Sequence, residues 1–358
     1  MSGSFGARMW LRKIKRYEGI RTIYTAENLG IPKYEQARAE ISNLYLGAPI
    51  IEKFKDRVVK SIESSRKMLA SKEDVFNFVH LASAEDSQVL HSLLKRYHSQ
   101  KTKSPFRFGP IVMRYYYSNG QPVEALKAFC DPDLDGLFED LSSLKLLMSL
   151  LYEHNMHSEI KDVFEVVKSK KSGNPVFVKT LSNIVLASCY KQNTPESYKL
   201  ATEIGRQDKE HVTRRGVEIA AAVALKQRDP GLALELLTAI DFSNNLLTRN
   251  LKILAYSSMD RPEEALRIIK RDLFRDIPTN VVPEAMKAMK EAVYRIKDDN
   301  QKDFVVPELK NLEADLREKG FLVEKSLDTH LLEPISGVKK RQILEESSES
   351  GHSDEMNG

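Results

Sequence analysis

Hydrophobic residues recur along this chain at the three- and four-residue spacing of amphipathic helices, and short polar turns interrupt them at a nearly constant distance. The turns align on one position, which falls at Pro122, His157, Pro195, Pro230 and Pro262. Proline suits the first turn of a helix because its missing N–H is not needed there and its fixed φ fits the helix. The pattern therefore predicts one helix before each turn and a second helix after it.

The helices before the turns are apolar on most sides, and the helices after them are amphipathic. First helices are predicted over residues 108–118, 142–153, 177–191, 213–227 and 246–258, and second helices over 123–129, 158–167, 196–204, 232–240 and 263–273. Such pairs cannot bury their apolar faces alone, so they stack on one another. The predicted fold class is all-α, a right-handed α-solenoid of stacked helix-turn-helix repeats with a concave groove. The alternative, a single globular bundle, would not need a constant period.

Changes in composition divide the chain into five parts. Residues 26–70 are expected to form N-terminal helices, 71–275 the repeat array and 276–332 the C-terminal capping helices. The polar, Ser- and Glu-rich tail at 333–358 is expected to be disordered. The remaining part, 1–25, differs from all of these in its charge.

The N-terminal segment is strongly basic. Residues 1–26 carry six Lys and Arg side chains and a single acid, Glu18, while Trp10 and Ile14 recur at helical spacing. A basic amphipathic helix with few acids is typical of a mitochondrial presequence. We therefore expect cleavage near residues 20–26 and a mature protein in the mitochondrial matrix. A basic surface helix of the mature protein is the alternative interpretation.

The overall composition excludes several classes of protein. The 358 residues include only 16 Gly and 14 Pro, which favours helix throughout, and the two cysteines are too few for a disulfide framework. The longest apolar run, residues 219–225, is far shorter than the roughly 20 residues of a membrane span. Phosphate-binding, nucleophile-elbow and zinc-protease motifs are absent from the sequence. We therefore expect no catalysis, no cofactor, no metal and no membrane span.

One stretch has the character of a polyanion-binding surface. No Asp or Glu occurs from Ser87 to Val123, although cations and aromatic residues alternate there. Cations pair with phosphates, and aromatic faces stack on unpaired bases. The candidates for backbone contact and stacking are Lys95, Arg96, Lys101, Lys103, Arg107, Arg114 and Tyr97. In the alternative interpretation, the aromatic residues belong to the core and the lysines to a solvated loop.

The repeat unit resembles the pentatricopeptide repeat. Its best copy has the turn Gly120-Gln-Pro-Val-Glu124-Ala125, and the likeness spans roughly residues 20–270. The resemblance implies a mitochondrial protein that binds single-stranded RNA, acts in transcript maturation and so supports the respiratory chain without catalysing a reaction. It also implies RNA-processing enzymes or the mitoribosome as candidate partners.

The same resemblance suggests where bases are read. The family reads one base per repeat, mainly through a polar residue early in each first helix and a second residue at the end of the unit. Transferred to this chain, these positions give the base-facing candidates Lys145, Asn183, Asn250, Thr213 and Asn245. Pro110 and Glu218 occupy equivalent positions and depart from the family's pattern. For the two helical Asn residues, a capping or inter-helix role is the alternative.

A second function class stays open at this point. A helical-repeat array can also serve as a protein–protein scaffold or as a mitoribosome-associated subunit, with peptide in its groove. The acid-free stretch favours RNA over peptide, because its cations match a phosphate backbone.

Overall fold

The computed structural model describes residues 22–45, 47–63, 69–100, 106–170, 175–208, 210–239, 245–275 and 277–335. Regular structure in these ranges is helical, apart from two isolated parallel bridges that join Tyr24 to Ile335 and Val281 to Leu322. Within the same ranges, no helix combines the length and the apolar character that a membrane crossing requires.

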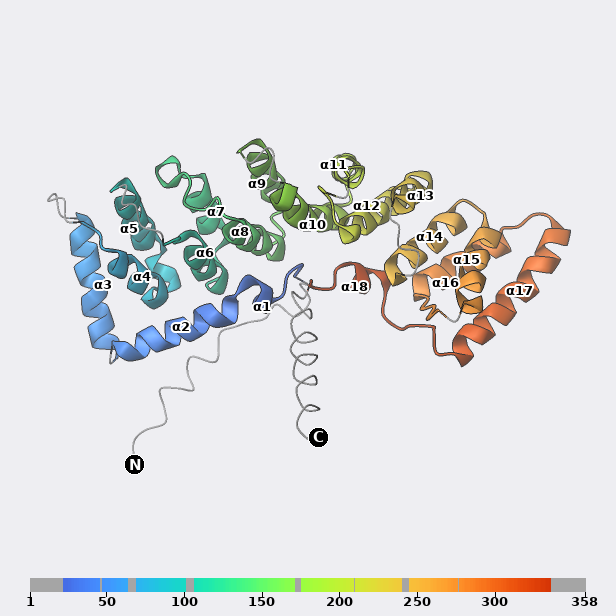
Figure 1. Ribbon diagram of the computed structural model, residues 1–358, viewed down its shortest axis with the longest axis horizontal. Coiled ribbons are helices and arrows are strands. Elements are labelled where there is room, and N and C mark those ends of the chain that lie inside the picture. The colour runs from blue at the N-terminus through green and yellow to red at the C-terminus, as the bar shows by residue number, and fades with distance from the viewer. Residues whose placement is uncertain are drawn as a thin grey trace, which may run out of the picture.

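Seven consecutive helix-turn-helix pairs form an arc (Figure 1). The pairs are α4 (Lys72–Leu81) with α5 (Ser87–Ser99), α6 (Gly109–Ser118) with α7 (Pro122–Cys130), α8 (Leu141–Glu153) with α9 (His157–Lys170), α10 (Pro175–Gln192) with α11 (Pro195–Gly205), α12 (Arg214–Lys226) with α13 (Pro230–Thr238), α14 (Leu246–Ser258) with α15 (Pro262–Phe274), and α16 (Pro283–Tyr294) with α17 (Asp299–Glu318). Two 3₁₀ turns, Ala84–Asp86 and Pro132–Leu134, lie between helices.

The first helices of the pairs line the inner side of this arc, and the second helices lie outside (Figure 1). Each first helix contacts the first helix of the next pair, from α4 through to α16. This arrangement confirms the expected all-α solenoid and excludes the single globular bundle. The helices predicted around the five aligned turns agree with the structure to within a few residues at either end.

The turns share one backbone conformation as well as one spacing. The residue two positions before each aligned position, which is proline in four turns and His157 in the fifth, has a positive φ. The values are 63° at Gly120, 58° at Asn155, 51° at Asn193, 60° at Arg228 and 54° at Asp260. A left-handed residue after a helix lets later N–H groups cap its last carbonyls. In four of the five turns, the N–H that follows donates to a carbonyl five residues back, as Gln121 does to Tyr116 at 3.0 Å.

Small residues let the two layers of helices approach closely. Ala125, Ala201, Ala233 and Ala265, on four of the second helices, are at most 1% exposed. A Cβ at Gly205, near the end of α11, would lie 2.8 Å from the Cβ of Ala220 on α12. Side chains larger than these would push the helices apart.

Both ends of the described chain return to the inner side of the arc. Helices α2 (Ile31–Leu44) and α3 (Ala48–Glu63) cover the first pairs, whereas α1 (Ala26–Leu29) and α18 (Leu327–Leu331) meet beneath the middle of the arc (Figure 1). The backbone of residue 335 donates a hydrogen bond to the carbonyl of Ile23 at 2.8 Å. We call residues 22–30 and 326–335 together the clasp.

Candidate functional site

The equivalent positions early in the first helices make contacts between repeats. Asn183, on α10, is 3% exposed, and its Oδ1 accepts a hydrogen bond from the Thr213 hydroxyl at 2.6 Å. Thr213 is also the N-cap of α12, where its hydroxyl oxygen accepts from the N–H of Gly216 at 2.9 Å. These two side chains therefore join one first helix to the start of the next.

The next repeat uses a carboxylate for the same purpose. Glu218, on α12, is 1% exposed and accepts hydrogen bonds from Thr248, at 2.7 Å, and from the amide of Asn245. Asn245 and Thr248 lie at and just inside the start of α14. Burial raises the pKa of Glu218, and hydrogen bonds from Thr248 and Asn245 oppose that rise.

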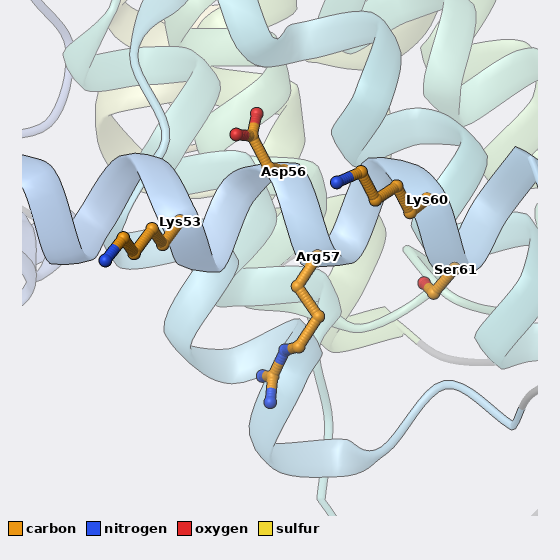
Figure 2. A pocket seen from close by; sticks show the side chains of 5 residues that line it. All are labelled: Lys53, Asp56, Arg57, Lys60 and Ser61. Carbon is orange, nitrogen blue, oxygen red and sulfur yellow. The ribbon is translucent and has the colours of Figure 1, made fainter.

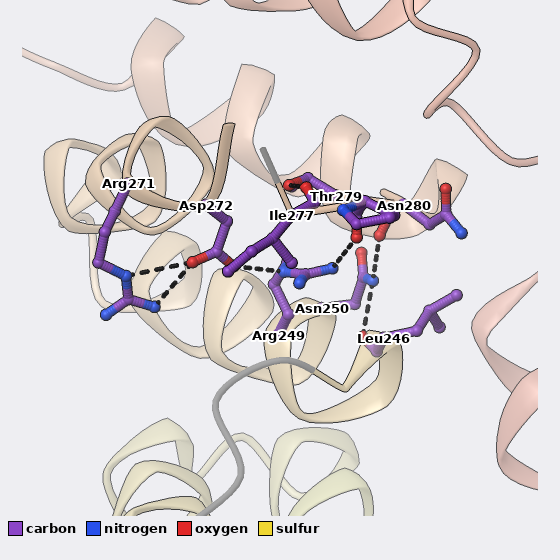
Figure 3. Close-up of polar contacts among 9 residues, drawn as sticks. Leu246, Arg249, Asn250, Arg271, Asp272, Ile277, Thr279 and Asn280 are labelled. Atoms are coloured by element: carbon purple, nitrogen blue, oxygen red, sulfur yellow. Dashed lines mark hydrogen bonds and ion pairs between the residues drawn. The ribbon is translucent and has the colours of Figure 1, made fainter. Parts of the chain in front are cut away.

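Asn250, on α14, repeats the arrangement toward α16. Its Nδ2 donates to the carbonyls of Leu246, at 2.8 Å, and Asn280, at 3.0 Å (Figure 3). Its Oδ1 accepts from the N–H of Val282 at 2.9 Å. Its neighbour Arg249 forms a fully buried ion pair with Asp272, with 2.7 Å between Nε and Oδ2.

These contacts change how the predicted base-facing residues are interpreted. Asn183 and Asn250 are buried, and their amides have partners inside the chain, so neither is presented to a ligand in this conformation. Thr213 and Asn245 are partly exposed, but both cap or clamp the following helix. The turns align as the sequence predicts, but these four side chains contact neighbouring helices or the segments that lead into them.

Like Asn183, which contacts Tyr24, the base-facing candidate Lys145 contacts the clasp. Its ammonium donates to the Asn28 side-chain oxygen and lies 4.4 Å from the centre of the Tyr24 ring. Burial lowers the pKa of Lys145, and no carboxylate in the described part of the chain opposes that shift. The clasp therefore covers a cation with neutral groups.

The N-terminal arm of the clasp makes further contacts on either side of Lys145. The Nε of Arg114, on α6, donates to the carbonyl of Leu29 at 2.9 Å, and burial lowers the pKa of this guanidinium. The Tyr24 hydroxyl donates to the carbonyl of Thr180, on α10, at 2.7 Å. This arm thus spans α6, α8 and α10.

The C-terminal arm continues across α10, α12 and α14. Nη2 of Arg215, on α12, donates to the carbonyls of His330 and Leu331, at 3.2 and 2.9 Å, and to that of Glu333. The Tyr190 hydroxyl, on α10, donates to the carboxylate of Asp328. Sequence analysis did not predict a role for Arg215, because nothing local indicates that a segment more than 100 residues away lies against it.

Acidic side chains from a later part of the chain lie beside the acid-free stretch, residues 87–123. The ammonium of Lys95 lies 2.7 Å from Asp131 and 3.1 Å from Asp133, two residues of the turn that follows α7. The hydrogen bond from Lys95 is the main reason that the pKa of Asp131 falls to about 2. A sequence window ignores partners beyond its ends, and here these partners neutralise one of its cations.

The other residues of this stretch have mixed environments. Arg96 donates to the carbonyl of Ile62 at 3.0 Å, and the half-buried Tyr97 packs edge-on against Phe108 at 5.2 Å. Arg107 is exposed. Lys101 and Lys103 lie outside the described residues.

A shallow hollow of about 400 Å³ lies on the outer face of α3. Figure 2 shows its lining residues Lys53, Asp56, Arg57, Lys60 and Ser61. Asp56 offsets part of the positive charge, and Arg57 is paired with Asp74 at 2.6 Å. The hollow therefore lacks the dense unpaired charge of a phosphate site.

No cluster of three or more His, Cys, Asp or Glu suited to a metal ion occurs in the described part of the chain. The Nδ1 of His157 forms a hydrogen bond with the Ser188 hydroxyl at 2.9 Å. Burial raises the pKa of the Cys189 thiol to about 11, which disfavours the reactive thiolate.

The chain resembles one group of curated proteins, although no protein-family model matches it. It is 26% identical over 235 residues to the mitochondrial pentatricopeptide repeat-containing protein 2 of Pongo abelii, which covers 63% of this chain and 61% of that protein. The protein of the same name from Danio rerio is 28% identical over 269 residues, with 74% and 69% covered. The human one is 25% identical over 213 residues, with 58% and 54% covered. The chain thus spans between about half and two thirds of the length of these relatives. The similarity agrees with the helix pairs of the structure.

Proposed function

We propose that this protein binds single-stranded RNA in the mitochondrial matrix and acts in transcript maturation, thereby supporting the respiratory chain without catalysing a reaction itself. The observation that carries the proposal is the set of cations on the inner surface of the arc. Arg114, Lys145 and Arg215 come from three different first helices, and each is covered by neutral oxygen acceptors of the clasp. Cations aligned along a groove suit a phosphate backbone.

The relatives support the cellular location. The proteins named above carry the word mitochondrial in their names, and residues 1–21 of this chain are basic with a single acid. We propose that these residues act as a presequence ahead of N-terminal helices, the repeat array, the capping helices and a polar tail. The bound RNA would be presented to processing enzymes or to the mitoribosome.

A direct binding measurement tests the central claim. Purified protein titrated into a fluorescein-labelled 20-nucleotide single-stranded RNA should give a saturable rise in anisotropy. The logarithm of the affinity should fall by about 0.7 per phosphate contact for each tenfold increase in salt. A duplex of the same sequence serves as the control. Absence of binding at low salt, both by the wild type and by variants in which the clasp is loosened, would refute the proposal.

A second candidate function is favoured by a separate observation. The inner side of the arc already holds polypeptide, because α1 of the same chain contacts α8 and α18 contacts α12 and α14. A protein–protein scaffold or a mitoribosome-associated subunit would use the groove in this way. Co-migration of the protein with a mitochondrial complex that survives RNase treatment would support this candidate over RNA binding.

A further inference from the structure

The clasp supplies oxygen atoms to the cations of the groove. The partners of Arg114, Lys145 and Arg215 are the carbonyl of Leu29, the amide oxygen of Asn28 and three carbonyls of residues 330–333. All of these acceptors are neutral. Phosphate oxygens would accept hydrogen bonds from the same donors, and an anionic acceptor adds an ion-pair attraction that a neutral oxygen lacks.

Lys145 is the least compensated of the cations beneath the clasp. Burial lowers the pKa of Arg114, of Lys145 and of Arg215. Asp140 opposes this shift at Arg114, and Glu218 and Glu333 oppose it at Arg215, whereas no described carboxylate opposes it at Lys145. The Nε of Arg215 is buried and has no hydrogen-bond partner in the described part of the chain. A half-buried cation with neutral partners gains from an anion that replaces them.

The cations extend along the groove. Helices α6, α8, α10 and α12 contact one another in sequence, and packed helices lie about 8–10 Å apart. The helices that carry Arg114 and Arg215 are therefore about 24–30 Å apart along the arc, and the helix that carries Lys145 lies between them. This spread matches an extended polyanion better than a single phosphate group.

The C-terminal arm is a short segment that is held by a few side chains. Its helix α18 has five residues and follows Gly320, whose φ is 68°. Leu327 and Leu331 are buried, and Asp328 is the acidic group that the arm directs at Tyr190. Local segments at chain ends open at a lower free energy than the whole fold.

We propose that the groove beneath the clasp is a binding site for the phosphodiester backbone of single-stranded RNA, and that the clasp is its internal competitor, which RNA must displace. The inference rests on the proposed function. It names the cations of the site and the device that limits access to them. The apparent affinity for RNA then equals the affinity of the open form multiplied by the fraction of molecules in which the clasp is open.

A reversible lock tests the proposal. Residues paired in a β-bridge lie within reach of a disulfide, so Tyr24→Cys with Ile335→Cys would join the two arms across the groove. The exposed Cys130 is replaced by Ser, whereas the buried Cys189 is kept. The oxidised protein should bind the labelled single-stranded RNA at least tenfold more weakly than the same protein after reduction. Equal affinity in the two states would overturn the proposal.

Loosening the clasp should strengthen RNA binding, whereas locking it should weaken RNA binding. Leu331→Ala removes a fully buried anchor of the arm, and Leu316→Ala on α17 is the matched control with the same burial away from the groove. Leu331→Ala should bind RNA several-fold more tightly than wild type, with faster amide exchange in residues 326–335. Leu316→Ala should leave RNA affinity unchanged. Faster exchange without tighter binding would contradict the proposal, and this test does not depend on the engineered cysteines.

The loosened protein also identifies the site. In the Leu331→Ala background, Lys145→Gln should weaken binding and flatten the salt slope by about 0.7, whereas Lys310→Gln on the exposed face of α17 should change neither. If wild type, reduced and loosened proteins all fail to bind RNA, the proposed function itself fails. If they bind equally well whether locked or open, RNA binding stands and the clasp is not a competitor.

Discussion

Arg228 holds a backbone conformation that suits its side chain poorly. It is exposed, its φ is 60°, and its equivalents in the other turns are Gly, Asn or Asp, which tolerate the left-handed region better. Arg228→Gly should therefore raise the free energy of unfolding by about 0.5–1 kcal/mol, because relief of the strain exceeds the added entropy of the unfolded chain. Urea denaturation followed by circular dichroism measures the change.

The equivalent glycine provides the matched control. Gly120 has a φ of 63°, and a Cβ there would meet no atom closer than 4.0 Å. Gly120→Ala should therefore lower stability by about 1 kcal/mol through the backbone alone. If both substitutions shift stability in the same direction, the turn conformation is not what limits these positions.

Glu218 should make stability depend on pH in an unusual direction. Its pKa is raised by burial above the value of about 4.3 for an exposed Glu. The folded state therefore holds this proton more tightly than the unfolded state, so stability is lost as the pH rises from about 4 through the folded-state pKa. Glu218→Gln cannot ionise, and its stability relative to wild type should improve between pH 4 and pH 7.

Glu313 provides a control of opposite sign. A hydrogen bond from Lys290 lowers its pKa, so its contribution grows as the pH rises. Glu313→Gln should become less stable relative to wild type over the same interval. The urea concentration at the midpoint of unfolding, measured at pH 4, 5.5 and 7, tests both predictions. If the stability of both variants relative to wild type changed in the same direction with pH, the opposite pKa shifts assigned to Glu218 and Glu313 would be contradicted.

At the scale of helices, the link from Asn250 to α16 should be structural. Replacing Asn250 by Ala leaves the carbonyl of Asn280 and the N–H of Val282 without their partner in a buried place. The loss should be about 2 kcal/mol or more. Because the Asn250 side chain is 0% exposed, the base preference of any bound RNA should not change. Thermal melting and a comparison of four homopolymeric RNAs test both statements.

Much of the array could be predicted from sequence, since periodicity and turn chemistry are local. Four aligned prolines and the equivalent His157 located five turns, and the structure shows the same left-handed conformation two residues before each of these positions. The direction of the side chains at the register could not be predicted. Asn183 and Asn250 have the polarity expected of base readers, and only the position of the next helix shows that their partners are protein.

At the scale of the molecule, the clasp could not be predicted from the sequence. Residues 22–30 and 326–335 are about 300 positions apart, and neither carries a pattern that specifies the other. For a related reason, the acid-free stretch did not reveal that Asp131 and Asp133 reach Lys95 from outside the window. Contacts between distant segments depend on the curvature of the whole array.

The clasp also limits where a presequence can end. Ile23 and Tyr24 fall inside the segment 1–25 that the sequence assigns to a presequence, yet they are 1% and 4% exposed and pair with the C-terminal arm. Cleavage beyond Thr22 would remove part of the folded clasp. We therefore expect a mature N-terminus at or before Thr22, at the early limit of the interval 20–26, and mass spectrometry of the protein isolated from mitochondria would identify it.

Two truncated proteins distinguish a removable presequence from an arm that belongs to the folded structure. A protein that starts at Thr22 should match the stability of the full chain, whereas one that starts at Ile31 loses the buried side chains of Ile23, Tyr24 and Leu29. At about 1.5–3 kcal/mol for each buried apolar side chain, the shorter protein should lose several kcal/mol. It should also release the C-terminal arm, because the pairing of Tyr24 with Ile335 is gone. Urea denaturation and hydrogen exchange of residues 326–335 measure these effects. Equal stability and equal protection in the two truncated proteins would mean that the N-terminal arm does not hold the clasp closed.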